Sequence, residues 1–525
     1  MSTFHDDMAQ GYSTDERTIG IGRPFVGEQT PLTDVEVGIP LRLLNRHGLI
    51  CGATGTGKTK TLQLLAERIS AEGSPVFAAD LKGDLAGLGA PGQPIEPVVE
   101  RDEQLQADWE AMAAPVELLS LTEDTGVPIR ASVSGFGPDL LSKVLGLNET
   151  QESSLSLVFQ FCDENELPLI ELEDLRAALA YLVGPGKEQL AEIGGVSKAT
   201  IGVIQRELAQ LEGDGGDVFF GEPEFDVKDL LRTTDDGRGV VSVLDLTGVH
   251  DRPALFSTFL MWLLAELFEQ LPEVGDPEQP ELVFFFDEAH LLFDGASKVF
   301  IDSVTRTARL IRSKGVGVFF VTQLATDVHE DVLAQLGHRV QHAVRAFTPK
   351  DAKALKATVD TFPSTDHYDL PELMQSLGVG EAAITVLDED GVPTPVAATR
   401  VYPPQSRMDP LTDDEREDIL DASPLLDLYD ERVDRESAEE MLSARMEQER
   451  ERARQLNEQK AAEKRASRTS SSRGRSRSPS SSRRRGSQRR RSNDDLAGQV
   501  SDLLGSRQGQ RIGKKVMRGI FGMLK

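Results

Sequence analysis

The sequence predicts an α/β fold with a mainly parallel sheet, and two observations lead to that class. The apolar run Gly48–Cys51 enters a glycine-rich segment, a helical pattern follows, and a second apolar run covers residues 75–80. This strand–loop–helix–strand order is the unit from which parallel sheets are built. Apolar runs at 239–246, 282–286 and 316–322, with helical patterns between them, extend the same sheet.

The other elements follow from the spacing of apolar and turn-forming residues. Residues 1–19 are polar, and we expect them to lack regular structure. Between Ile19 and Leu44, short apolar pieces separated by Gly and Pro predict brief strands and turns. The helix after the glycine-rich segment should end at Gly73. The remaining predictions are helices at 253–270 and around 297–313, and strands near 339–347 and 382–388.

A different pattern interrupts the sheet between residues 139 and about 212. We interpret this segment as an all-helical insertion, so that the sheet is assembled from two parts of the chain. Apolar residues recur there at helical spacing: Leu140, Leu141, Val144 and Leu147, then Leu155, Val158, Phe159 and Cys162.

The C-terminal part of the chain changes character again. Residues 411–468 are helical in pattern and highly charged, and the Ser/Arg-rich residues 467–492 are predicted to be disordered. The last 30 residues regain an amphipathic pattern. The predicted segments are an N-terminal short-strand segment (1–45), a first core segment (46–138), the helical insertion (139–212), a second core segment (213–405), a charged helical segment (406–466), a disordered linker (467–493) and a C-terminal amphipathic segment (494–525).

Length and composition favour a cytoplasmic protein of several domains. The chain has 525 residues, of which 39% are hydrophobic and 27% charged. The longest apolar stretch, Ala254 to Phe268, is too short to span a bilayer. The N-terminus carries acids where a signal peptide would be basic. Because Cys51 and Cys162 are the only cysteines, we expect no disulfide framework and no cysteine-based metal site.

The net charge of −30 is unevenly distributed. Residues 461–525 hold 18 Lys and Arg against 4 Asp and Glu, whereas the other 460 residues hold 39 against 83. The acidic body opposes nonspecific binding of DNA at low ionic strength. The basic tail could contact nucleic acid, an anionic membrane surface or a protein partner, or its amphipathic helix could dock on the body of the protein.

The glycine-rich segment matches the pattern G-x-x-x-x-G-K-[ST] of a phosphate-binding loop. It reads Gly52-Ala53-Thr54-Gly55-Thr56-Gly57-Lys58-Thr59. The glycines let backbone N–H groups turn toward a phosphate, Lys58 would reach the β- and γ-phosphates of ATP, and the Thr59 hydroxyl would coordinate Mg²⁺. The strand before it and the helix after it, which the motif requires, are both predicted.

The buried strand Leu282–Phe286 ends in two acids. Asp287 would hold Mg²⁺ through water, and Glu288 would polarise an attacking water molecule. The alternative is an aspartate that caps a helix, but the pairing with a phosphate loop favours the catalytic interpretation. An acid directly after the Mg²⁺-binding aspartate indicates hydrolysis of ATP rather than a kinase or a GTPase switch.

Three further features leave alternatives open. Gln323 follows the strand 316–322 and would sense a γ-phosphate or be an ordinary surface residue. Residues 80–84, Asp-Leu-Lys-Gly-Asp, follow the second strand and would contact ligand or form a turn with local hydrogen bonds. His47 and His290 flank motifs, and we expect structural roles for them. The arginines form a solvated face, or one of them reaches the γ-phosphate of a neighbouring subunit: Arg306, Arg309, Arg312 or Arg345.

Together these motifs resemble the HerA-like helicase family, and more closely its YjgR-type branch within the HerA–FtsK superfamily of P-loop ATPases. The similarity covers about residues 19–405 and the final apolar and basic segment. It rests on the runs Arg46 to Thr59, Asp80 to Leu85, Phe286 to His290, Gly315 to Val318 and Gln341 to Pro349.

The resemblance implies a RecA-like P-loop ATPase of a kind that tends to form hexameric rings, with relatives that pump DNA or protein. Only about 45 residues precede the phosphate loop, too few for the N-terminal β-barrel with which HerA engages the NurA nuclease, so we expect no NurA-type partner. By motif, the resemblance assigns nucleotide binding to Lys58 and Thr59, Mg²⁺ and water to Asp287 and Glu288, sensing to Gln323, and a finger role to Arg309 or Arg312.

We therefore expect a Mg²⁺-dependent ATP-hydrolysing ring motor, a helicase or DNA translocase that moves or remodels nucleic acid. The alternative is an ATP-gated assembly factor, or one peripheral to the membrane, that does not act on DNA. The acidic body and the basic amphipathic C-terminus speak for this alternative.

Overall fold

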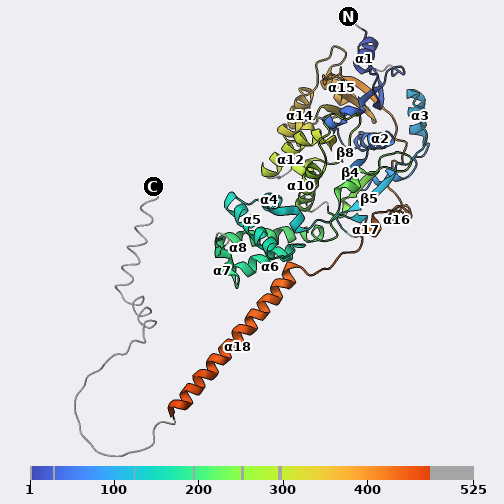
Figure 1. Ribbon diagram of the computed structural model, residues 1–525. Helices are drawn as coiled ribbons and strands as arrows, with labels where there is room; N and C mark the ends of the chain where they lie inside the picture. The colour runs from blue at the N-terminus through green and yellow to red at the C-terminus, as the bar shows by residue number, and fades with distance from the viewer. Residues whose placement is uncertain are drawn as a thin grey trace, which may run out of the picture. The chain divides into compact units, whose positions relative to one another are not determined.

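The computed structural model describes residues 3–27, 30–122, 125–192, 195–213, 215–249, 253–293 and 298–472. The chain divides into two compact units, Met1–Glu451 and Arg452–Lys525. The sheet and every predicted site residue belong to the first unit (Figure 1). The prediction of disorder for residues 467–493 is wrong for residues 467–472, which belong to the helix α18 (Ala438–Ser472). The rest of that segment and the predicted amphipathic segment 494–525 fall outside the described residues.

A sheet of twelve strands, counted over the described residues, forms the centre of the first unit. Its order is β2-β1-β12-β11-β10-β3-β9-β8-β4-β7-β5-β6. The strands from β10 to β6 run parallel, as predicted, whereas β2, β1, β12 and β11 pair antiparallel. The strands are β1 (Thr18–Pro24), β2 (Val37–Pro40), β3 (Gly48–Cys51), β4 (Val76–Asp80), β5 (Val116–Ser120), β6 (Val127–Pro128), β7 (Val241–Asp245), β8 (Leu282–Phe286), β9 (Val316–Thr322), β10 (His338–His342), β11 (Glu381–Thr385) and β12 (Ala397–Val401).

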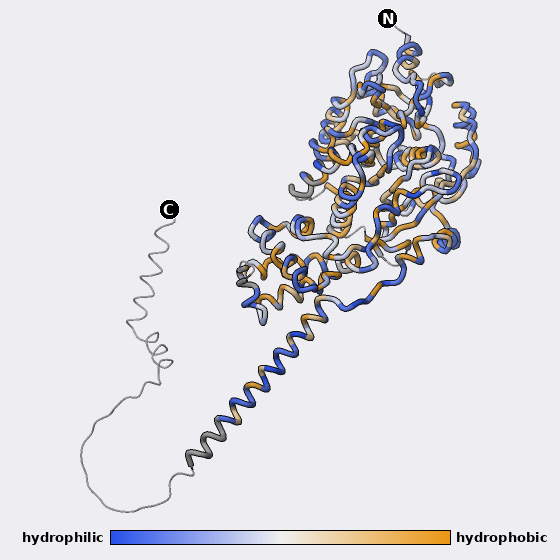
Figure 2. Tube along the Cα trace, viewed as in Figure 1, coloured by the Kyte–Doolittle hydropathy of each residue, from blue (hydrophilic) through white to orange (hydrophobic). Residues whose placement is uncertain are grey.

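Helices cover both faces of this sheet because its parallel strands are apolar on both sides. All five residues of β8 are buried. Phe284 and Phe286 pack in the same core as the helices α10 (Pro253–Gln270) and α12 (Lys298–Ile311), whereas Val283 and Phe285 pack in the core that contains α2 (Lys58–Ala71). In Figure 2 many residues along the middle of the first unit are coloured as hydrophobic.

The helices between β6 and β7 form a layer of their own at one end of the first unit (Figure 1). The first of them begins with a single turn at Val133, which Ser132 caps by accepting a hydrogen bond from the Gly135 N–H. The backbone is non-helical at Gly137, so the rest of this helix begins close to the predicted residue 139. Their apolar residues share a core with α10 and one face of the sheet. They are α4 (Val133–Val144), α5 (Glu149–Glu164), α6 (Leu172–Val183), α7 (Lys187–Glu192), α8 (Lys198–Gly213) and α9 (Gly216–Phe219).

The N-terminal residues differ from the prediction, because α1 (Phe4–Tyr12) is a regular helix. Thr3 and Asp6 form a capping box at its start, and Met8 is fully buried in the core on the α2 side of the sheet. The expectation that residues 1–19 lack regular structure is therefore wrong. The burial of one methionine among polar neighbours comes from tertiary packing, which local composition does not reveal.

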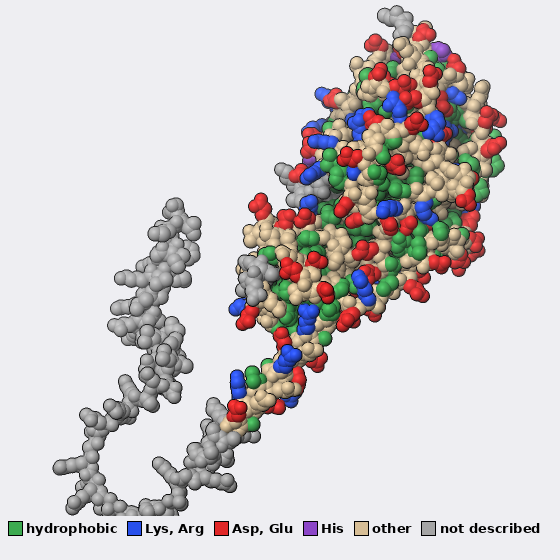
Figure 3. All heavy atoms as spheres, viewed as in Figure 1, with side chains coloured by type: hydrophobic (Ala, Val, Ile, Leu, Met, Phe, Trp, Pro, Cys, Tyr) green, Lys and Arg blue, Asp and Glu red, His purple; other side chains and the backbone are tan. Residues whose placement is uncertain are grey.

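The remaining helices complete the fold. Among the described helices, none is both long and apolar enough to cross a membrane. Where α18 is coloured in Figure 2 it is mostly hydrophilic, and acidic side chains are spread over the face of the first unit that Figure 3 shows. These helices are α3 (Glu96–Leu105), α11 (His290–Phe293), α13 (Glu330–Leu333), α14 (Pro349–Val359), α15 (Leu370–Ser376), α16 (Asp413–Asp421), α17 (Leu426–Tyr429) and α18 (Ala438–Ser472).

Candidate functional site

The predicted site residues meet at the carboxyl edge of the parallel sheet. The phosphate loop joins β3 to α2, and β9 separates β3 from β8. Because these strands are parallel, their carboxyl ends lie along one edge, which is where open α/β sheets bind ligands. Lys58, Gln323 and Asp287 follow the ends of β3, β9 and β8, and Asp80 is the last residue of β4. The strand order thus assembles motifs that are more than 200 residues apart in the chain.

The phosphate loop has the backbone conformation that its glycines permit. Gly55 has φ +76° and Gly57, the residue before α2, has φ +115°, both in the left-handed region that other residues rarely adopt. The Thr56 hydroxyl donates to the Ala53 carbonyl at 2.7 Å, and the Lys58 ammonium donates to the same oxygen at 3.3 Å. The loop therefore presents the start of α2, whose free N–H groups and dipole favour an anion.

The two acids after β8 lie beside Lys58. Burial lowers the pKa of Lys58, and the carboxylates of Glu288 and Asp287 oppose that shift. Burial also raises the pKa of Asp287 to about 6, although a hydrogen bond from the Glu288 N–H at 2.8 Å favours its charged form. Asp287 is only 2% exposed, and its Oδ2 atom has no hydrogen-bond partner among the described residues. A buried, unsatisfied carboxylate oxygen of this kind suits a cation.

Glu288 has a strained backbone conformation, and its carboxylate lies beside Lys82 and His290. Its φ of +48° lies in the left-handed region, which costs a residue other than glycine about 1 kcal/mol or more. One carboxylate oxygen forms an ion pair with the Lys82 ammonium, and the other lies 3.3 Å from Nδ1 of His290. Strain of this sort persists where the surroundings enforce it, as they do at catalytic sites.

The loop that carries Lys82 is shaped by Asp80. The Asp80 carboxylate accepts hydrogen bonds from the N–H groups of Lys82 at 3.1 Å, Gly83 at 2.8 Å and Leu85 at 2.8 Å. Asp80 thus forms the turn with local hydrogen bonds, while Lys82 reaches the site. The sequence marked the segment but did not identify Lys82 as the partner of Glu288, because 206 residues separate the two.

Asp287→Asn is expected to stabilise the nucleotide-free protein by about 1–3 kcal/mol above pH 7. The pKa of Asp287 is about 6 in the folded protein against 3.8 ordinarily, so the folded state binds the proton more tightly. Raising the pH through 6 therefore removes stability from the wild type. Asn carries no charge, and its oxygen can still accept from the Glu288 N–H.

Urea unfolding of both proteins between pH 5 and pH 8 measures this difference. The advantage of Asp287→Asn should be largest at pH 8 and should shrink as the pH falls below 6. The exposed Asp302 on α12 supplies the matched control, since Asp302→Asn should follow the wild type at every pH. A constant advantage, or none at pH 8, would contradict the argument.

The sensor and arginine candidates occupy different edges of the sheet. Gln323 is exposed at the carboxyl end of β9, between the phosphate loop and the two acids. Arg309 and Arg312 line a cavity of about 270 Å³ with His47 and Gly337, the residues directly before β3 and β10. That cavity lies at the amino edge, so the structure does not bring these arginines to the phosphate loop of the same chain.

The other arginines are exposed or paired with an acid, and the two flanking histidines differ in their surroundings. Arg306 is exposed on α12, and Arg345 is exposed after β10. Arg312 lies 3.6 Å from a carboxylate oxygen of Asp276. His47 is buried and accepts a hydrogen bond from the Val318 N–H at 3.0 Å, so its role is structural, as expected. His290 instead lies against the carboxylate of Glu288 at the site.

Two supports of the phosphate loop were not predicted. His342 is buried, its Nε2 atom lies 2.9 Å from the Thr61 hydroxyl, and a Cβ on Gly52 would clash with it at 2.5 Å. On the outer side of α2, Glu67 accepts hydrogen bonds from the Gln405 and Ser406 N–H groups at 2.7 and 2.9 Å. Lys60 and Gln63 donate to backbone carbonyls of the same segment, residues 405–408. We call residues 405–408 the strap.

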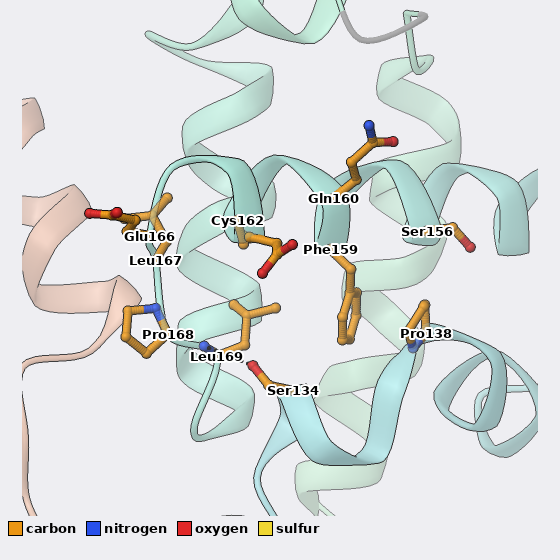
Figure 4. Close-up of a pocket in the computed structure, with 11 residues that line it drawn as sticks. Ser134, Pro138, Ser156, Phe159, Gln160, Cys162, Glu166, Leu167, Pro168 and Leu169 are labelled. Atoms are coloured by element: carbon orange, nitrogen blue, oxygen red, sulfur yellow. Dashed lines mark hydrogen bonds between the residues drawn. The ribbon is translucent and has the colours of Figure 1, made fainter.

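A cavity in the helical insertion is separate from this site. It has a volume of about 600 Å³ and lies between α4, α5 and the loop after α5. Figure 4 shows Phe159 of α5, Leu169 of the loop and Ser134 of α4 lining it. Cys162 also lines it, and burial raises the pKa of this thiol to about 12, so it is protonated at neutral pH. Within the described ranges, no cluster of His, Cys, Asp and Glu could hold a metal ion.

The fold and site together define a P-loop NTPase with a RecA-like core. A glycine-rich loop leads from a strand into a helix, and a strand ending in two acids lies one strand away in a mainly parallel sheet. The strand between them ends in a polar amide, Gln323. This arrangement separates the class from nucleotide-binding folds whose acidic strand is adjacent to the phosphate-loop strand.

The chain belongs to the family described as Helicase HerA-like C-terminal, whose model matches residues 27–525. The predicted family is thereby confirmed, and assignment to its YjgR-type branch stays a prediction. The DNA double-strand break repair helicase HerA of Sulfolobus acidocaldarius is 24% identical over 356 residues, which cover 67% of this chain and 64% of that protein. The HerA of Saccharolobus solfataricus is 22% identical over 359 residues, with the same coverage. The chain thus spans 64% of the length of these relatives.

Solved structures of two other proteins are also similar to this chain. The plasmid coupling protein TrwB in complex with ADP and Mg²⁺ has a TM-score of 0.49 and 15% identity, and the match covers 76% of this chain and 98% of that one. VirB4 of Thermoanaerobacter pseudethanolicus has a TM-score of 0.45 and 15% identity, and the match covers 77% and 99% of the two chains.

Proposed function

We propose that this protein is a Mg²⁺-dependent ATPase that works as a ring-forming motor on nucleic acid. One observation carries the proposal: the carboxyl edge of the sheet places Lys58, Asp287 and Glu288 together in a buried, charged site. Membership of the HerA-like family supports the same activity, and the relatives named above are described as DNA repair helicases.

The residues divide the chemistry between binding and proton transfer. The backbone N–H groups of the phosphate loop and the Lys58 ammonium would hold the β- and γ-phosphates. Thr59 and Asp287 would hold Mg²⁺, which neutralises phosphate charge when bound. The Oδ2 atom of Asp287, which has no hydrogen-bond partner in the described part of the chain, fits that role.

Glu288 would act as the base in hydrolysis. Water attacks the γ-phosphorus, the bond from that phosphorus to the bridging oxygen breaks toward ADP, and a Glu288 oxygen accepts the proton from water. One oxygen of the carboxylate is paired with Lys82, whereas the other has no hydrogen-bond partner among the described residues and can accept from the water. Lys82 would therefore hold Glu288 in place during the reaction.

Nucleic acid is the proposed substrate, and a nucleic-acid-dependent ATPase assay tests it. ATP hydrolysis is measured with single-stranded DNA, duplex DNA, or vesicles of anionic lipid, each over a series of salt concentrations. We expect DNA to increase the rate and lipid to leave it unchanged. Stimulation by vesicles alone would instead identify the alternative factor peripheral to the membrane, and no stimulation by DNA at any salt concentration would overturn the proposal.

A further inference from the structure

We propose that α14 and the segment before it form a contact surface for single-stranded nucleic acid. The surface consists of Arg345, Phe347, Lys350, Lys353 and Lys356, and we call it the α14 surface. The inference rests on the proposed function and adds to it the place where the substrate is held.

Cationic side chains are concentrated on α14 in an otherwise acidic body. Residues 1–451 contain twelve lysines, and three of them, Lys350, Lys353 and Lys356, lie three residues apart on this one helix. Side chains at that spacing are neighbours on a helix surface. All three are exposed, and within the described ranges none forms an ion pair. Their charge therefore remains available for a polyanion.

Arg345 and Phe347 stand in the segment directly before α14 and add an exposed cation and an exposed aromatic ring to the lysines of the helix. Arg345 is exposed, and Phe347 is 86% exposed, the largest value among the exposed large hydrophobic residues of the described chain. The backbone is fixed at this point, because Asp351 accepts hydrogen bonds from the N–H groups of Phe347 at 3.1 Å and Thr348 at 2.9 Å. The ring is thus presented to solvent by an ordered segment.

Cations beside an exposed ring match the chemistry of single strands. Lysines neutralise phosphates, and an aromatic side chain stacks on an unpaired base, whose faces are free only when the strand is not in a duplex. An acidic protein partner would satisfy the lysines but would leave Phe347 without a comparable role. The combination therefore favours single-stranded nucleic acid.

The α14 surface is joined to the nucleotide site on two sides. The Ala343 carbonyl, just after β10, accepts a hydrogen bond from the Ala53 N–H of the phosphate loop at 2.8 Å. On its inner face, Leu355 belongs to the same apolar cluster as Leu324, the residue after Gln323. Movement of either nucleotide-contacting segment would reach the α14 surface through one or two residues, as a motor requires.

Binding of a fluorescent oligothymidine to the full-length protein, measured by anisotropy at several salt concentrations, tests the lysines. The variant Lys350→Gln/Lys353→Gln/Lys356→Gln should lower the magnitude of the slope of log affinity against log salt by about 2, since each phosphate contact on a single strand contributes about 0.7. The matched control is Lys187→Gln/Lys198→Gln/Lys228→Gln, which removes the same charge from exposed positions elsewhere. This control should keep the wild-type slope. Binding through the tail is common to all three proteins and cancels in the comparison.

Phe347 is tested separately because stacking on a base depends less on salt than the contacts of lysines with phosphates do. Phe347→Ala should weaken binding roughly fivefold or more at every salt concentration without changing the slope. Phe347→Trp should restore the affinity. A purely structural role for Phe347 would not give this separation of affinity from salt slope.

The outcomes separate this inference from the function on which it rests. If DNA stimulates the wild-type ATPase, yet the α14 triple variant shows wild-type slope and stimulation, the motor stands and the α14 surface is wrong. If DNA stimulates no form of the protein, the proposed function has failed. If the triple variant loses ATP-dependent oligomers on size exclusion while its binding slope is unchanged, the surface contacts a second copy of the chain, and the inference is overturned.

Discussion

Glu288→Gln is expected to reduce ATP hydrolysis by about 100-fold or more while nucleotide binding is retained. Gln has nearly the same shape but cannot take the proton from the attacking water. The phosphate loop and Lys58, which would provide the binding energy, are untouched by the change. Single-turnover hydrolysis and the affinity for a fluorescent ATP analogue, measured on the same preparation, separate the two steps.

Two further variants serve as comparisons for Glu288→Gln. Lys58→Ala should lose nucleotide binding itself, because the backbone loop alone lacks the charge that meets the β- and γ-phosphates. Glu281→Gln makes the same chemical change at the amino end of β8, on an exposed residue, and should hydrolyse ATP like the wild type. Equal rates for Glu288→Gln and the wild type would remove Glu288 from its role.

The second large effect is expected from Arg309→Ala or Arg312→Ala: the variant that removes the acting arginine should lower hydrolysis by about 10³-fold with normal ATP binding. An arginine can stabilise the charge that grows on the γ-phosphate, but these two lie by the cavity at the amino edge of the sheet. The phosphate loop of the same chain is at the carboxyl edge. Either arginine would therefore have to act on a neighbouring copy in the ring.

Mixing variants tests whether the site is shared. Lys58→Ala protein keeps its arginines, and Arg309→Ala or Arg312→Ala protein keeps its phosphate loop, so a mixture should regain part of the activity that each lacks alone. Arg206→Ala, an exposed arginine of α8, is the matched control and should need no partner. If no ratio of the two proteins restores hydrolysis, or if the protein stays monomeric with ATP, the arginines Arg306, Arg309 and Arg312 form a solvated face.

The fold class and the site motifs could be predicted because their signals are local. The phosphate loop needs a strand, a glycine-rich turn and a helix in immediate succession, and the strand before Asp287 is a continuous apolar run. Parallel strands then bring both to one edge by a general rule of α/β sheets. No pairing between distant residues had to be known.

The details that were missed depend on such pairings. The ion pair between Lys82 and Glu288 joins residues 206 positions apart, and the contact of His342 with Thr61 spans 281 positions. The capping box of α1 was readable in principle, but the burial of Met8 that fixes the helix is a tertiary contact. The antiparallel edge of the sheet is formed by short strands, of which β1 and β2 contain glycines, and their local pattern specifies no partner.

The strap connects α2, and with it the phosphate loop, to the chain that leads into α16. The helix that begins with Lys58 carries Glu67, whose buried carboxylate is satisfied by the backbone of Gln405 and Ser406. If bound nucleotide favours one position of α2, it therefore also favours one position of the chain that leads into α16. Linkage is reciprocal, so a partner that binds α16 and favours one position of the strap would change the affinity for nucleotide by the same factor by which nucleotide changes the affinity for that partner.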